Sequence, residues 1–175
     1  MTLIRVIGVA LTLVASGVLG LYLSGLGKFR LQDLLEFKKA LLILKSEIEY
    51  VATPLPEAMA NISVRTTKPI SLIFEHYSQS LKNNSEGETA YQLWIASIKI
   101  HKQKSFLKDD DWEIIENFGK TLGYLDKQMQ VDTITFTTDY IDAQVSKLQE
   151  INEKNQRMYR SLGVVGGILL LVIFW

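Results

Sequence analysis

The sequence predicts an all-α protein, a cytoplasmic bundle of about six helices tethered by an N-terminal and a C-terminal transmembrane helix. Apolar residues recur every three or four positions, without the sustained alternation of strands. The three prolines all lie between Pro54 and Pro69, which leaves the rest free to form long helices. Both ends are almost uncharged, and all 19 acidic residues lie between Asp33 and Glu153. We therefore expect a first transmembrane helix (1–27), a middle domain (28–160) and a short second transmembrane helix (161–175).

The first segment, Val6 to Gly27, contains no charged residue and exceeds the roughly 20 residues that cross a bilayer core. A cleaved signal peptide is the alternative, but its apolar core would be about 7–15 residues long, followed by a small-residue cleavage site. Small residues recur here at every fourth position, and Gly163 and Gly167 repeat that spacing. Such stripes let helices pack closely in lipid, although small residues are also common in membrane helices generally. The stripe consists of Gly8, Thr12, Ser16, Gly20 and Ser24.

The middle domain opens with an amphipathic pattern from Leu31 to Val51. Pro54 ends this helix and starts a short second one, because a proline biases the preceding residue away from helix. A third helix is expected near Pro69. The stretch Ser85–Glu88 fits a capping box, which predicts the start of a fourth helix.

An acidic run, Asp109 to Asp111, predicts the start of a fifth helix, since carboxylates favour the positive end of the helix dipole. A metal site is the alternative, but hard-cation loops interleave their ligands and include a glycine. Gly123 suits a left-handed helix end, after which Asp126 can cap the next helix.

One long helix is expected from Asp126 to Trp175. Its apolar part, from Leu162, gives only about 21 Å of helix against a hydrocarbon core of about 30 Å. We expect a short spanning helix, with a half-inserted anchor as the alternative. Asn152 and Asn155 fall where its apolar seam would continue, which predicts looser packing there. The seam consists of Val131, Ile134, Thr138, Ile141, Val145 and Leu148.

Basic residues flank the middle domain on both sides. Lys28, Arg30 and Lys38 follow the first segment, and Arg157 and Arg160 precede the last. Because positive charge favours the cytoplasmic side, the middle domain is placed in the cytoplasm and both termini outside. The sequence thus predicts a multi-pass protein of the cell membrane, in contact with the lipid bilayer.

No catalytic, cofactor or metal site is predicted. Gly119–Thr121 resembles the end of a phosphate-binding loop, but Ile114 stands where that pattern requires glycine, and no strand precedes it. Cysteine is absent, which excludes thiolate chemistry. His76 and His101 lie far apart in the sequence, so surface or internally hydrogen-bonded histidines are expected. The balance of 19 basic and 19 acidic residues gives no basis for nucleic-acid binding.

Three stretches carry a resemblance to a known family: Leu44–Leu55, Phe118–Asp126 and Glu153–Gly163. With the apolar ends, they resemble stage III sporulation protein AB of endospore-forming bacteria over essentially the whole chain. The Glu-Ile-x-Tyr-x-x-Thr-Pro-Leu element at Glu47–Leu55 is the most specific. The family's motif residues fall here at Glu47, Tyr50, Thr53, Pro54, Leu55, Gly119, Leu122 and Gly123.

The resemblance implies a component of the sporulation channel or secretion apparatus between mother cell and forespore. Such a component would lie in the mother-cell (outer forespore) membrane and be similar to platform proteins of type II secretion and type IV pilus machines. A secretion-type ATPase and other components of the complex are its implied partners, and a homo-oligomer is left open. The alternative is a helical membrane sensor or adaptor without catalytic activity.

Glu47, Tyr50 and Thr53 are the candidate partner interface. Glu47 and Tyr50 are favoured because polar groups at a covered surface require hydrogen-bond partners. The sequence leaves open whether the motif residues contact a partner or set the fold, and Pro54 and Gly123 suit helix boundaries.

Overall fold

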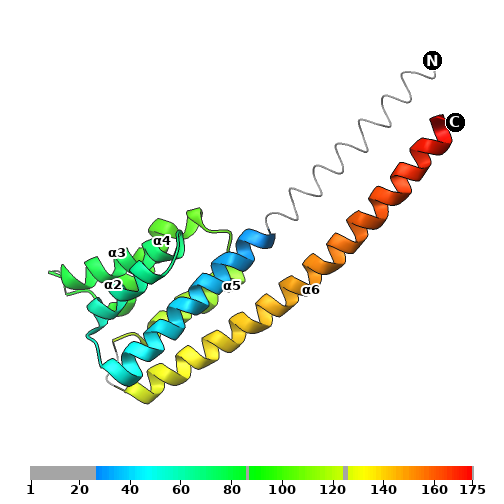
Figure 1. Cartoon of the computed structure of the whole chain (residues 1–175). Coiled ribbons are helices and arrows are strands. Elements are labelled where there is room, and N and C mark those ends of the chain that lie inside the picture. The colour runs from blue at the N-terminus through cyan, green and yellow to red at the C-terminus, as the bar shows by residue number, and fades with distance from the viewer. Residues whose placement is uncertain (1–26, 86, 124–125, 175) are drawn as a thin grey trace. The chain divides into compact units, whose positions relative to one another are not determined.

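The computed structural model describes residues 27–85, 87–123 and 126–174, and beyond residue 154 it describes the side-chain surroundings of Met158 alone. Within these ranges the backbone forms helices joined by short turns, without a strand, which confirms the all-α prediction (Figure 1). The chain divides into two compact units. One runs from Arg30 to Val145 and is called the bundle below; the other comprises the two ends, Met1–Phe29 and Ser146–Trp175.

The first described helix covers residues 27–46 and continues into a π-helical turn, η1 (Glu47–Val51). Three helices follow: α2 (Leu55–Arg65), α3 (Ile70–Lys82) and α4 (Ala90–His101). The 3-10 turn η2 (Lys102–Lys104) leads to α5 (Asp109–Phe118), and α5 ends in a second 3-10 turn, η3 (Gly119–Thr121). The long helix α6 covers Lys127–Phe174.

The core of the bundle is built around the fully buried indole of Trp94 in α4. Its Nε1 donates a hydrogen bond to the Ile115 carbonyl at 3.0 Å, which fixes the ring against α5. Gly119 lies directly against the same ring, where an added Cβ would stand 1.9 Å from Cδ1. Only glycine therefore fits at position 119. Four aromatic rings complete the cluster, with centroids 5.2–6.5 Å from that of Trp94: Phe37, Phe74, Tyr77 and Phe118.

Two helix starts test the predicted caps. The capping box predicted at Ser85–Glu88 is wrong, because α4 begins later, with Thr89 as its N-cap. The Thr89 hydroxyl accepts from the Gln92 amide, while the Gln92 side chain accepts from the Thr89 amide. The earlier residues form a loop instead, in which the Asn84 side chain both donates to and accepts from the Glu88 backbone. The helix start predicted at Asp109–Asp111 is confirmed by α5.

A buried ion pair joins the first helix to α5. The Arg30 guanidinium donates two hydrogen bonds to the Asp111 carboxylate, both at 2.8 Å, and Asp111 is 1% exposed. Its Oδ2 also accepts from the Lys108 amide at the start of α5. A second buried carboxylate, Asp33, accepts from Ser105 and from the Phe106 amide and so holds the loop before α5. Burial raises the pKa of Asp33 above its ordinary value.

The predicted long helix is confirmed by α6, whose 48 residues run without a break. All the seam residues predicted for it are buried: Val131, Ile134, Thr138, Ile141, Val145 and Leu148. Asn152, at the predicted end of the seam, is half-buried, and its Oδ1 would lie 2.9 Å from a Cβ added at Gly27. Glycine thus allows the amide to lie close to the first helix within the unit formed by the chain ends.

The predicted localisation, a multi-pass protein of the cell membrane with a cytoplasmic middle domain, is contradicted. Within the part of the chain that the structure describes, no helix is both long enough and apolar enough to cross a membrane. The uncharged end of α6 is too short to cross, since about 21 Å of apolar helix is less than a hydrocarbon core of about 30 Å. The placement of the middle domain in the cytoplasm from its flanking positive charges is weakened as well. Two of those charges, Arg30 and Lys38, form ion pairs with Asp111 and Asp142 in the bundle. Apart from Gly27, the predicted first segment lies outside the described residues.

Candidate partner-binding turn

The candidate site is the link between the first helix and α2. The chain leaves the first helix through η1, reverses at Ala52 and re-enters helix at α2 with Pro54 as its N-cap. Ala52 has φ 54° and ψ 38°, a left-handed conformation that costs a residue with a Cβ about 1–2 kcal/mol. Such a conformation persists only where its surroundings hold it in place.

Glu47 supplies that support. Its carboxylate accepts from the Thr53 hydroxyl at 2.5 Å and from the Asn61 side-chain amide at 3.2 Å. Its carbonyl accepts from the amides of Ala52 and Thr53. Glu47 is 6% exposed, so its polar atoms are used inside the turn. Glu47 and Thr53 thus position the chain on both sides of the reversal.

Tyr50 lies on the outer side of this turn and is 82% exposed, next to Val51 at 63%. The neighbouring Glu49 carbonyl accepts from Lys127 Nζ at 2.7 Å, which ties η1 to the first turn of α6. An aromatic and an aliphatic side chain are therefore presented on a backbone that is held at several points. The structure thus places the three predicted interface residues in one turn, with Tyr50 outward and Glu47 inward.

Four other family motif residues lie at positions that the fold itself requires. Pro54 caps α2, and Leu122 is buried at 5% exposure. Gly119 makes room for Trp94, and Gly123 has φ +84°, a conformation that side chains rarely adopt. Tyr50 is the exception, since its exposed ring contributes little to packing. This contrast makes Tyr50 the candidate of the turn for a contact with another molecule.

The predicted packing residues of the ends cannot be compared in the same way. Gly8, Thr12, Ser16, Gly20 and Ser24 lie outside the described residues. Gly163 and Gly167 lie in the backbone of α6, in the part whose side-chain surroundings are not described.

The structure also brings together two histidines that are 25 positions apart in the sequence. The rings of His76 and His101 lie edge to face with centroids 5.8 Å apart. His76 Nδ1 lies 3.0 Å from the Ser97 hydroxyl, which itself donates to the Leu93 carbonyl. Burial first, and then the charge of Lys104, lowers the pKa of His101. Sequence reasoning missed this pair because its members lie on different helices.

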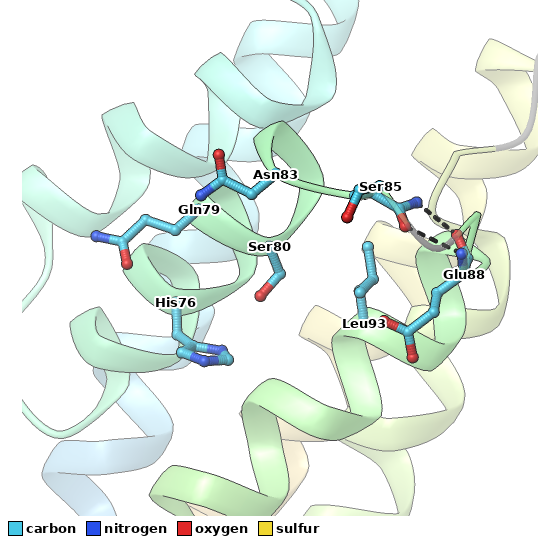
Figure 2. Close-up of a pocket in the computed structure, with 8 residues that line it drawn as sticks. His76, Gln79, Ser80, Asn83, Ser85, Glu88 and Leu93 are labelled. Carbon is cyan, nitrogen blue, oxygen red and sulfur yellow. Dashed lines mark hydrogen bonds between the residues drawn. The ribbon is translucent and has the colours of Figure 1, made fainter.

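His76 also lines an open hollow of about 430 Å³ beside the loop from α3 to α4, shown in Figure 2. The lining is mostly neutral and polar, from Gln79, Ser80, Asn83 and Ser85, with one carboxylate from Glu88. Among the described residues no group of three or more His, Cys, Asp or Glu side chains could hold a metal ion. The hollow therefore offers hydrogen bonds but no concentrated charge.

These features define a small helical domain with a closed aromatic core and one exposed aromatic turn. Comparison with known proteins identifies the family: stage III sporulation protein AB matches residues 5–175, so the chain belongs to this family. Stage III sporulation protein AB of Bacillus subtilis (strain 168) is 28% identical over 171 residues, which cover 98% of this chain and 99% of that protein. A solved structure of stage III sporulation protein AB matches with a TM-score of 0.65 and 27% identity, covering 71% of this chain and 97% of the solved one. Membership of the family gives the protein a role in sporulation.

Proposed function

We propose that this protein is a non-catalytic, platform-like component of the sporulation channel apparatus between mother cell and forespore, and that its η1 turn docks a secretion-type ATPase. The observation that carries the proposal is the exposure of Tyr50, at 82%, on a turn whose backbone Glu47 fixes from inside. Family membership supports the sporulation part of the proposal. The ATPase is the partner that the resemblance to secretion platforms implies.

The different roles of the exposed Tyr50 ring and the buried Glu47 carboxylate support docking at the η1 turn. Aromatic side chains dominate binding energy at interfaces, since a ring buries a large area and has few torsions to immobilise. A turn that is already ordered before binding loses less conformational entropy when the partner arrives. Tyr50 provides the aromatic ring, and the hydrogen bond between Glu47 and Thr53 keeps the backbone of the turn ordered.

The test is capture of the cognate ATPase by the full-length chain carrying Tyr50→Ala. We expect capture to fall at least about tenfold, the effect of losing one aromatic hot spot. The matched control is Val64→Ala in α2, which removes an equally exposed apolar side chain (84%) away from the turn and should leave capture unchanged. Equal losses for both variants, or full capture by Tyr50→Ala, would refute docking at the turn. If the unaltered chain captures no ATPase, the adaptor alternative gains over the platform proposal.

A further inference from the structure

An acidic face lies on the first turns of α6. Phe136 and Met129 are 67% and 48% exposed, and because they are seven residues apart they share one side of the helix. Together with Asp126 and Asp132 they line a shallow hollow of about 510 Å³. These four residues are called the acidic face below. Exposed apolar side chains flanked by carboxylates form a surface suited to a partner with apolar and basic groups.

The two carboxylates of the acidic face have no cationic partner among the described residues. Asp126 Oδ1 accepts from the backbone amides of Gln128 and Met129, so it caps α6. Asp132 Oδ1 accepts from the Gln128 side-chain amide. Lys127, the nearest cation in the sequence, donates instead to the Glu49 carbonyl. No described cation therefore forms an ion pair with the acidic face.

A basic segment of the same chain has the complementary character. Between Lys99 and Lys108 the apolar side chains of Ile100 and Phe106 are 54% and 46% exposed. Lys99, Lys104 and Lys108 are exposed and have no carboxylate partner within the described part of the chain, whereas Lys102 pairs with Asp109 at 3.3 Å. The segment thus offers two apolar side chains and three lysines that form no ion pair with a described carboxylate.

The two patches lie toward opposite ends of the bundle, so one copy cannot bring them together. The basic segment is fixed near the start of the first helix, where Ser105 and Phe106 donate to Asp33. The start of α6 is fixed at the other end of the same helical stretch, where Lys127 donates to the Glu49 carbonyl. Sixteen residues separate positions 33 and 49, which corresponds to about 24 Å of helix. A contact of either patch with its own copy on a second chain would bring like charges together.

We propose that a second copy of this chain binds the acidic face through its basic segment, giving a head-to-tail contact. Each contact brings Met129 and Phe136 of one copy against Ile100 and Phe106 of the next, with lysines near Asp126 and Asp132. Since each copy keeps one unused patch, the contact repeats and produces rings or open chains. A contact of a few side chains belongs to the small, weak class of interfaces, below about 1,200 Å² in total. We therefore expect assembly at high local concentration and a strong dependence on salt.

The experiment uses the absence of cysteine from the chain, which removes any background of native thiols. Two full-length variants, Asp132→Cys and Lys104→Cys, carry different tags and are oxidised separately and together. The proposal expects a disulfide-linked dimer from the mixture, and a several-fold lower yield in about 0.5 M salt, where charges beyond a few ångströms are screened. A matched Glu57→Cys variant on the exposed start of α2 replaces Asp132→Cys as the control for random collision. Dimers from Asp132→Cys alone, or equal yields with the control, would overturn the proposal.

Sedimentation of charge variants tests the same contact without introduced cysteines. Asp126→Asn/Asp132→Lys inactivates the acidic face, and Lys99→Gln/Lys104→Gln inactivates the basic segment without making it complementary to the altered face. All four positions are exposed and asparagine can still cap α6, so the fold should persist, as circular dichroism can check. Each variant alone should sediment as a monomer. Their mixture keeps one intact patch of each kind and should sediment as a dimer of about twice the mass, without larger species. Monomers in the mixture would overturn the head-to-tail contact.

Discussion

Gly119→Ala is the substitution for which the structure predicts the largest effect of a single methyl group. The new Cβ would stand 1.9 Å from Trp94 Cδ1, 2.6 Å from Nε1 and 2.7 Å from Cγ, so either the ring or the backbone must move. The ring has little room, since it is fully buried, surrounded by aromatic rings and hydrogen-bonded to the Ile115 carbonyl. Overpacking costs about 1–3 kcal/mol and loss of the buried hydrogen bond about 1–3 kcal/mol more. We expect a total loss of about 3–5 kcal/mol.

Thermal unfolding followed by near-UV circular dichroism measures this loss and reports on the indole environment as well. At about 2–4 °C per kcal/mol for a chain of this size, the melting temperature should fall by roughly 10 °C. Gly87→Ala is the matched control: its φ is +73° but nothing lies within 4 Å, so only the backbone cost of about 1–2 kcal/mol applies. Equal melting temperatures for Gly119→Ala and the unaltered chain would show that Trp94 is not confined. Trp94→Phe should relieve part of the Gly119→Ala penalty, because a smaller ring leaves room for the methyl group.

Three further predictions concern buried polar groups. Tyr77 is fully buried and its hydroxyl has no hydrogen-bond partner among the described residues, so Tyr77→Phe should leave stability unchanged or raise it by about 1 kcal/mol in urea unfolding. Arg30→Met strands the Asp111 carboxylate and should cost about 3–5 kcal/mol, whereas Arg30→Met/Asp111→Leu should cost clearly less; equal costs would count against a buried pair. Since burial raises the pKa of Asp33, the folded chain binds its proton more readily than the unfolded chain, and stability from this group falls as pH rises through the raised pKa. The free energy of unfolding relative to Asp33→Asn should therefore be larger near about pH 4 than near about pH 7, and a flat difference would contradict the shift.

Periodicity was sufficient to predict the parts of the fold in which neighbours in sequence share a face. The seam of α6 is such a case, because its residues face one way whatever they pack against. Asp111 shows where this reasoning stops. The sequence assigned it to a helix start, which is confirmed, but its pairing with Arg30 joins residues 81 positions apart and leaves no periodic signal. From its sequence position alone, Arg30 counts as one of the flanking charges that determine topology.

The start of α4 shows a second limit of prediction from sequence, because two neighbouring segments both fit the pattern of its N-terminal cap. Ser85–Glu88 and Thr89–Gln92 both satisfy the sequence pattern of a capping box, with serine or threonine three residues before glutamate or glutamine. The choice between them depends on the loop, where Asn84 bonds the Glu88 backbone and so keeps that residue out of the helix. Such a bond is visible only once the chain is folded.

For the candidate site, the sequence found the turn but could not assign its residues to roles. Glu47 and Tyr50 are three positions apart, a spacing that in a regular α-helix puts two side chains on one face. The π-helical turn changes this arrangement, since its wider spacing and the reversal at Ala52 put Glu47 inside and Tyr50 outside. The buried Glu47 carboxylate orders the backbone of the turn, and the exposed Tyr50 ring is the side chain that the docking proposal assigns to the contact with the partner. If the docking proposal holds, loss of Glu47 must weaken binding through disorder of the turn, whereas loss of Tyr50 must weaken it while the turn stays intact.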